Sequence, residues 1–519
     1  MAEYMQRLMA NKQTEKKPMN EPIQVKNEVE VTFGDEVDLD VGSGKGSDSD
    51  CFLMRRNRFF LIVFVTCLFI YLIVHLNRRK EKVKGSEYDR PVRGLEHIPA
   101  IFREYCQFLE YGVNGDEGED FTFYEGEEGR RLKLRAVVVT FRHGERSPMH
   151  EIQDELACAP VRNVDRTRFA RYKELMESDE YIDYFKVDEK LKNYPRVPDS
   201  SICAPGMLTA EGALQHVRLG RFFRKAYQNS KLFLHDEGYR INATVVTSQY
   251  ARTLQSALAF SSEFLYKLSE FVPSVFVKAA RHTHQCVDDF CDCPLSKEMR
   301  EKYEEELLEY MEKDPFSREK IAPIVKVFHE FGNYSEPLHI LDVSLGNYIC
   351  RKKSLPCRGD LCLDFNLLKE LVVKTSARAQ ALFDDKQGGI SKRLQVIEAN
   401  SILGYVAQTI DRVQRFPHTN FIKIFSGHDT VVGPILRVLG LYNNDPPHYT
   451  SRVVFEIYEH PEEGTLLRIL QNGLDVTKNV EFCRDHLFLK LCKTQAFLEF
   501  FNNLFRKVGV KSMKEACHV

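Results

Sequence analysis

Short apolar runs alternate with longer amphipathic segments through most of the chain. The runs are rich in β-branched residues and predict buried strands at 132–141, 243–247, 420–425, 453–458 and 465–471. The amphipathic segments predict helices over about 210–227, 252–268 and 431–439, with Thr209 placed to cap the first. Strands that alternate with helices predict a layered α/β fold with helices on both faces of one sheet.

A different pattern lies near the amino end. Residues 59–76 are nearly all apolar and include no Asp, Glu, Lys or Arg. As a helix this segment reaches about 27 Å, enough to cross a thin bilayer. Basic residues on both sides argue against a buried core helix, and the 58 residues before it argue against a cleaved signal peptide. We expect one transmembrane helix at 59–76, a disordered cytosolic tail at 1–58 and a stem at 77–94.

The orientation of this span depends on two opposing signals. More Lys and Arg follow the span than precede it, which by itself favours a cytosolic C-terminal part. Twelve of the 14 cysteines follow the span, however, and this even number favours disulfides in an oxidising lumen. The cysteine clusters lack paired Cys-x-x-Cys spacing, which disfavours zinc sites. With glycosylation sequons at Asn242 and Asn333, we predict a single-pass type II membrane protein with a lumenal C-terminal part.

Candidate chemistry follows three of the predicted strands. Residues 142–148 read Arg-His-Gly-Glu-Arg-Ser-Pro, residues 426–430 read Ser-Gly-His-Asp-Thr, and Arg252 follows the strand at 243–247. The carboxyl ends of parallel strands share one edge of a sheet, so we expect these segments to converge. Arginine forks match phosphate oxygens and a neutral imidazole is a nucleophile, so residues 142–148 predict a phosphate site with a nucleophile in it. The formal net charge of −2 gives no basic footprint for nucleic acid.

With these segments in this order, the chain resembles the histidine acid phosphatases, a branch of the phosphoglycerate-mutase-like superfamily. Their signature Arg-His-Gly-x-Arg-x-Pro matches at all five fixed positions, and their His-Asp signature matches at 428–429. The resemblance spans about 95–519 and implies a three-layer α/β core in a lumenal domain. It also implies that the charged, helix-rich stretches at about 150–200 and 280–395 are insertions that form a mostly helical cap over the site.

The resemblance implies a role for each site residue. His143 is the expected nucleophile, which forms a phosphohistidine intermediate. Asp429 is the expected general acid, protonated part of the time at mildly acidic pH. The expected phosphate-binding residues are Arg142, Arg146, Arg252 and His428. Because guanidinium groups neutralise the charge, the scheme needs neither metal nor cofactor, and Glu145 at the variable position is expected to be solvated or salt-bridged.

Within the family, several stretches are similar to phosphatases that act on xylose in the proteoglycan linker: 56–59, 252–256, 291–294, 472–477 and 516–518. We therefore expect removal of the 2-phosphate of xylose in the glycosaminoglycan–protein linker, at the Golgi membrane and near glycosaminoglycan-synthesising enzymes. Arg281 and His282 are candidate cap contacts for uronate or sulfate groups. Two alternatives stay open: a phosphatase for inositol phosphates or lysophosphatidate, and a non-catalytic glycan-binding membrane protein.

Overall fold

The computed structural model describes residues 98–109, 132–149, 163–199, 204–228, 230, 232–233, 240–281, 293–327, 337–384 and 389–517. All of them belong to the unit Lys84–Val519. Among these residues no helix is long and apolar enough to cross a membrane. The predicted tail, transmembrane span and stem lie outside the described residues.

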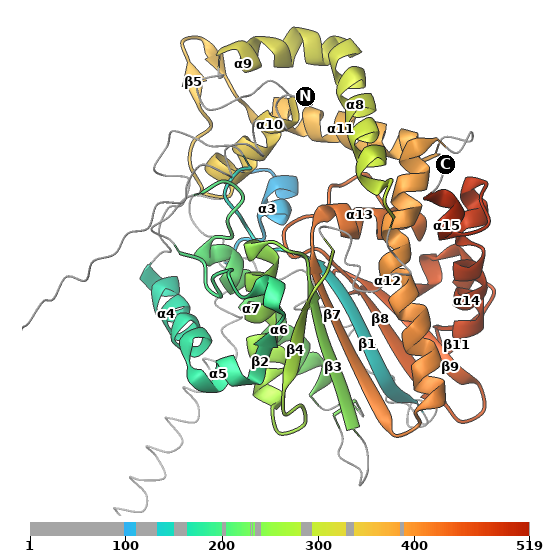
Figure 1. The fold of residues 1–519 in the computed structure, drawn as a ribbon. Helices are drawn as coiled ribbons and strands as arrows, with labels where there is room; N and C mark the ends of the chain where they lie inside the picture. Colours follow the sequence, from blue (N-terminus) through green and yellow to red (C-terminus); the bar gives the residue numbers. More distant parts are fainter. Residues whose placement is uncertain are drawn as a thin grey trace, which may run out of the picture. The chain divides into compact units, whose positions relative to one another are not determined.

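One mixed sheet runs through the fold (Figure 1). Five of its strands are mutually parallel: β1 (Lys133–Arg142), β7 (Thr419–Gly427), β3 (Arg240–Thr247), β4 (Val275–Ala279) and β2 (Phe185–Val187). The others pair antiparallel: β8 (Arg452–His460), β9 (Gly464–Gln471), β10 (Leu474–Asp475), β11 (Leu487–Phe488) and β12 (Leu491–Lys493). The order across the sheet is β11-β12-β9-β8-β1-β7-β3-β4-β2, with β10 beside β9.

The predicted strands and helices are all present, with bounds that differ by a few residues. The three predicted helices are α6 (Ala210–Tyr227), α7 (Ala251–Phe264) and α13 (Asp429–Val438). Thr209 caps α6 as predicted, because its hydroxyl accepts a hydrogen bond from Gly212 N at 3.0 Å. Helix α7 ends at Phe264, earlier than predicted, and the chain continues as the 3₁₀ turn Tyr266–Leu268.

Helices cover both faces of the sheet, and the side chains of β1 alternate between two cores. Ala136 and Val138 contribute to a core with α12 (Ile390–Arg415), α13, α14 (Thr494–Asn502) and α15 (Met513–Ala516). Val137 and Val139 contribute to the opposite core, with α6 and α7. Nine successive residues of β1 are buried, as expected for a central strand covered on both faces. The predicted layered α/β core is therefore confirmed.

A third hydrophobic cluster lies apart from these two. It is formed mainly by α3 (Ala100–Cys106), α8 (Ser296–Lys313), α9 (Ala322–Val327), α10 (Pro337–Val343) and α11 (Phe365–Asp384). We call helices α8 to α11 the cap, and Figure 1 shows them together beyond one end of the sheet. The π-helical turns Ser317–Ile321 and Ser344–Ile349 and the hairpin of β5 (Cys357–Arg358) and β6 (Leu361–Cys362) connect them. The cap falls within the predicted insertion at 280–395.

The described part of the other predicted insertion, 150–200, is different. After α4 (Asn163–Glu177) and α5 (Asp179–Tyr184), strand β2 pairs with β4 at the edge of the main sheet. Tyr181, Phe185 and Leu191 are fully buried in the core that α6 and α7 share. This part therefore belongs to the sheet rather than to a cap. A strand of three residues carries too little periodicity to be recognised in a sequence.

Disulfides join eight of the described cysteines: Cys106–Cys350, Cys293–Cys517, Cys357–Cys362 and Cys483–Cys492. The first two link segments 244 and 224 residues apart. Cys357–Cys362 closes only the β5–β6 hairpin. The prediction of disulfides after the apolar span is confirmed for these cysteines.

Candidate active site

The three predicted segments meet at the carboxyl ends of β1, β7 and β3. His143 N donates a hydrogen bond to Gly427 O at 2.9 Å, which joins the exits of β1 and β7. Arg252 lies in the first turn of α7, directly after β3. The rings of His143 and His428 are 5.5 Å apart between centres, and Arg252 Nη2 is 3.4 Å from His428 Nδ1. The structure thus brings side chains from three distant segments into one buried cluster.

His143 is buried, and its hydrogen bonding fixes its tautomer. Its Nδ1 lies 2.7 Å from Gly144 O. A carbonyl oxygen can only accept, so Nδ1 carries the ring proton and Nε2 keeps its lone pair. Burial, followed by the positive charges of Arg252 and Arg142, lowers the pKa of His143 well below 6.5. The ring is therefore neutral, which is the form that can attack phosphorus.

Gly144 allows the start of α6 to pack directly against residues 142–148, which we call the motif. A Cβ atom at Gly144 would lie 2.2 Å from Gly212 O, and one at Gly212 would lie 2.2 Å from Glu145 O. The turn is held by hydrogen bonds from Gly144 N to Ser256 Oγ at 3.2 Å and from Glu145 N to Gln215 Oε1 at 2.9 Å. Helices α6 and α7 therefore both fix the backbone that directs His143.

Arg142 lies between an aspartate and two tyrosine rings. Its Nη2 is 3.0 Å from Asp429 Oδ2, and its Nη1 donates to Tyr105 Oη at 3.0 Å and to Pro447 O at 2.6 Å. Its guanidinium carbon lies 5.1 and 4.7 Å from the ring centres of Tyr105 and Tyr449. Burial alone would lower the pKa of Arg142, but Asp429 and the tyrosines raise it above its usual value. Arg142 is therefore a fixed, permanent cation.

Asp429 begins α13 and is 42% exposed, which leaves its carboxylate accessible from the site. Its Oδ1 accepts a hydrogen bond from Thr430 N at 2.9 Å. Partial burial raises the pKa of Asp429, but Arg142, Arg146 and His428 together lower it below the usual value. The resting site therefore holds a carboxylate. This differs from our expectation of partial protonation in mild acid, because the sequence brought Arg142 into the same site but did not predict its direct 3.0 Å contact with Asp429.

Arg146 is held by a residue that sequence analysis missed. Its Nη2 lies 2.9 Å from Asp342 Oδ1, and its Nη1 donates to Ser147 O at 2.9 Å. Asp342 Oδ2 in turn accepts a hydrogen bond from Met149 N at 2.7 Å. Asp342 lies on the cap helix α10, 193 residues after Met149, and no motif or spacing marks it in the sequence.

Arg252 and His428 form a second pair beside His143. Because Arg252 Nη2 can only donate, His428 Nδ1 accepts from it and His428 Nε2–H donates to Ser248 Oγ at 2.8 Å. Burial, followed by the charge of Arg146, lowers the pKa of Arg252 to about 10, so it stays protonated at neutral pH. In this arrangement His428 orients Arg252, and its role as a donor to phosphate stays a prediction.

Glu145 is buried in the structure, so the expectation that solvent surrounds it is wrong. The alternative expectation of an ion pair is confirmed, because Arg351 Nη1 lies 3.1 Å from Glu145 Oε1. Arg351 follows Cys350, which is bonded to Cys106 beside Tyr105. One disulfide thus joins two segments that each contact the motif.

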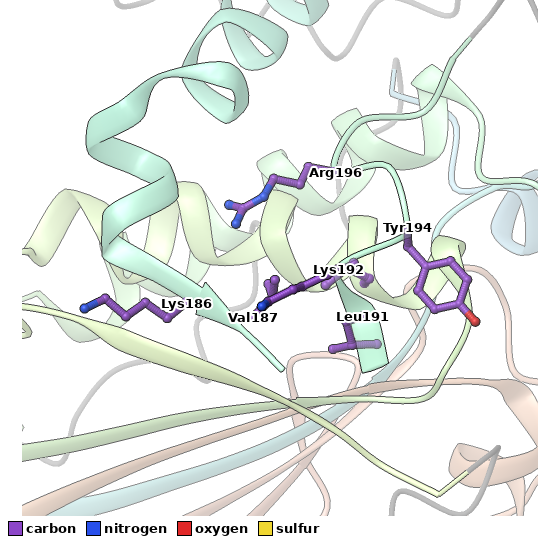
Figure 2. A pocket seen from close by; sticks show the side chains of 7 residues that line it. Lys186, Val187, Leu191, Lys192, Tyr194 and Arg196 are labelled. Carbon is purple, nitrogen blue, oxygen red and sulfur yellow. The ribbon is translucent and has the colours of Figure 1, made fainter. Parts of the chain in front are cut away.

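The remaining predicted residues lie elsewhere. Asn242 is exposed on β3, and its Oδ1 accepts a hydrogen bond from Lys423 Nζ at 3.2 Å. Arg281 is partly buried just after β4, whereas His282 and Asn333 lie outside the described residues. A pocket of about 470 Å³ lies beside β2, and Figure 2 shows side chains that line it; none of the predicted catalytic or phosphate-binding residues is among the residues that line this pocket.

Comparisons with known proteins agree with the motifs. The Histidine phosphatase superfamily (branch 2) matches residues 133–339. The chain is 27% identical over 414 residues to 2-phosphoxylose phosphatase 1 of Xenopus tropicalis, covering 76% of this chain and 79% of that protein. It is 28% identical over 387 residues to the Homo sapiens protein of the same name, covering 70% and 75%. A multiple inositol polyphosphate phosphatase from Bifidobacterium longum aligns with a TM-score of 0.44 at 12% identity, covering 73% of this chain and 92% of that one.

Proposed function

We propose that the chain hydrolyses phosphomonoesters through a phosphohistidine at His143, since the Histidine phosphatase superfamily (branch 2) matches its residues 133–339. The observation that carries this proposal is the state of His143. Its proton is held on Nδ1 by Gly144 O, its ring is neutral, and its Nε2 lone pair is available as the nucleophile. Three guanidinium groups lie around it, and these are the groups that bind phosphoryl oxygens: Arg142, Arg146 and Arg252.

In the first step, Nε2 of His143 attacks phosphorus and the bond from phosphorus to the leaving oxygen breaks. The three arginines stabilise the charge on the equatorial oxygens, and Asp429 gives its proton to the departing oxygen. In the second step, the Asp429 carboxylate takes a proton from water while the water oxygen attacks phosphorus. The P–N bond then breaks, which releases phosphate and restores neutral His143.

Asp429 must gain a proton before it can act as the acid. In the resting site Arg142, at 3.0 Å, keeps it ionised. A bound phosphate competes for the same guanidinium charge and brings negative charge close to the carboxylate, and both effects raise a carboxyl pKa. A phosphomonoester has a second pKa of about 6, so its monoanion can supply the proton in mild acid. An acidic optimum therefore follows without a protonated Asp429 in the free enzyme.

We propose 2-phosphoxylose in the glycosaminoglycan–protein linker as the substrate, because two proteins named for that activity align with 70% or more of this chain. We further propose a type II protein of the Golgi membrane with its catalytic domain in the lumen, near the enzymes that extend the linker. The apolar segment 59–76 and the disulfides support this placement, since disulfides persist in oxidising compartments. Asn242 is exposed near the amino end of β3, so a glycan on it would leave the carboxyl ends of the strands, where the site lies, uncovered.

A substrate panel tests this function. The full-length protein in detergent is assayed against a phosphoxylosyl oligosaccharide, inositol phosphates, lysophosphatidate and p-nitrophenyl phosphate, with His143→Ala as the inactive control. We expect the highest kcat/KM for the phosphoxylosyl substrate, and accumulation of phosphorylated linker in cells that lack the protein. A preference for inositol phosphates or lysophosphatidate, with unchanged linker phosphorylation, would instead support the alternative phosphatase.

A further inference from the structure

Building on the proposed phosphatase function, we propose that Asp342 determines substrate specificity. It selects a phosphomonoester whose neighbouring carbons carry hydroxyl groups, and it rejects one that carries a second phosphate there. Asp342 belongs to neither of the two sequence signatures. It lies on the cap helix α10 and contacts Arg146, one of the predicted phosphate-binding residues.

Contacts to both carboxylate oxygens hold Asp342 in place. Oδ1 lies 2.9 Å from Arg146 Nη2, and Oδ2 accepts a hydrogen bond from Met149 N at 2.7 Å. The side chain of Asp342 is 21% exposed, so it stays partly accessible while it contacts Arg146. A carboxylate oxygen has a second lone pair, which a sugar hydroxyl can use as an acceptor and a phosphate oxygen cannot. The contact is therefore favourable to a hydroxyl and repulsive to a second phosphate.

The charges of the site support the same conclusion. Among the described residues, the site holds the guanidinium groups of Arg142, Arg146 and Arg252. Two carboxylates contact them: Asp429 contacts Arg142, and Asp342 contacts Arg146. The further guanidinium that contacts the motif, Arg351, is paired with buried Glu145. One bound phosphate is thus enough to neutralise the net positive charge of the site. A second phosphate would be repelled by the negative charge of Asp342. A unit charge within a few ångströms of a second phosphate, at partial exposure, changes binding by on the order of tenfold.

Asp342→Asn tests the proposal, because asparagine keeps an acceptor for Met149 N but removes the charge. The matched control is Asp314→Asn, also in the cap, where Asp314 accepts from Ser317 N at 3.0 Å and from Lys374 Nζ at 3.3 Å. The readout is the ratio of kcat/KM for an inositol monophosphate to that for an inositol bisphosphate with adjacent phosphates. We expect a wild-type ratio well above one, a fall on the order of tenfold in Asp342→Asn, and no change in Asp314→Asn.

A purely structural role gives a different result. If Asp342 only positions Arg146, Asp342→Asn lowers kcat/KM for both substrates equally, and the unchanged ratio overturns the proposal. Calorimetric binding of the two inositol phosphates to His143→Ala, with and without Asp342→Asn, gives the same ratio without turnover. A wild-type protein that hydrolyses no phosphomonoester refutes the proposed function, whereas these binding ratios still decide the role of Asp342.

Discussion

Replacing Arg252 with glutamine should move the acidic limb of activity to higher pH. In the free enzyme only neutral His143 is a nucleophile, so kcat/KM falls as the pH drops through the pKa of His143. That pKa lies well below 6.5, first because of burial and next because of the charge of Arg252. Removing the charge raises the pKa of His143, and the acidic loss of activity therefore begins at a higher pH.

The size of this shift follows from the geometry. Arg252 Nη2 lies 3.4 Å from His428 Nδ1, and the ring centres of His428 and His143 are 5.5 Å apart. The charge therefore lies within about 10 Å of His143, where at an effective dielectric constant of about 20 it contributes about 1.5 kcal/mol. One pKa unit corresponds to about 1.4 kcal/mol, so the acidic limb should rise by about one pH unit.

The assay compares Arg252→Gln with Arg252→Lys, which keeps the charge but loses the planar fork. Both variants should lose kcat/KM for p-nitrophenyl phosphate, but only Arg252→Gln should shift the acidic limb. Ionisation of the substrate is the same for every enzyme, so the difference between profiles reports the enzyme. Titration of the His143 ring by NMR gives the pKa without turnover. Identical limbs for both variants and the wild type would refute the electrostatic reasoning.

Three further predictions test other parts of the site. Asp429→Asn should slow the hydrolysis of a sugar phosphate by about 10²- to 10⁴-fold. Hydrolysis of p-nitrophenyl phosphate should slow far less, since nitrophenolate leaves without a proton, and equal losses on both substrates would exclude Asp429 as the acid. Gly144→Ala should abolish turnover and lower Tm because its Cβ would lie 2.2 Å from Gly212 O, whereas Gly433→Ala, with its nearest neighbour at 3.5 Å, should retain both; a wild-type Tm for Gly144→Ala would contradict this. Replacing both Cys106 and Cys350 with serine should raise KM more than replacing Cys357 and Cys362, since only the first pair holds Tyr105 and Arg351 on the motif; equal effects would disprove that coupling.

The elements that carry the motifs could be predicted because their signals are local. The apolar run of β1 and the N-cap residue Thr209 of α6 each depend on neighbouring residues alone. The edge strand β2 could not be predicted in this way, because three residues show no periodicity and its place depends on pairing with β4. The ionised state of Asp429 was also beyond the sequence, since it depends on the 3.0 Å contact with Arg142.

The site residues that the sequence did not reveal share a physical cause. Three residues contact the motif from α3 and the cap: Tyr105, Asp342 and Arg351. They lie too far from the motif in the sequence for any local spacing to reveal them. In the sequence, nothing distinguishes each of them from any other polar residue of a partly exposed helix or loop. In the function that we propose, the motif residues bind the phosphate and therefore determine the reaction, whereas Asp342 in the cap contacts what is attached to the phosphate. A related chain that keeps residues 142–148 but replaces Asp342 should therefore keep the reaction and change the substrate.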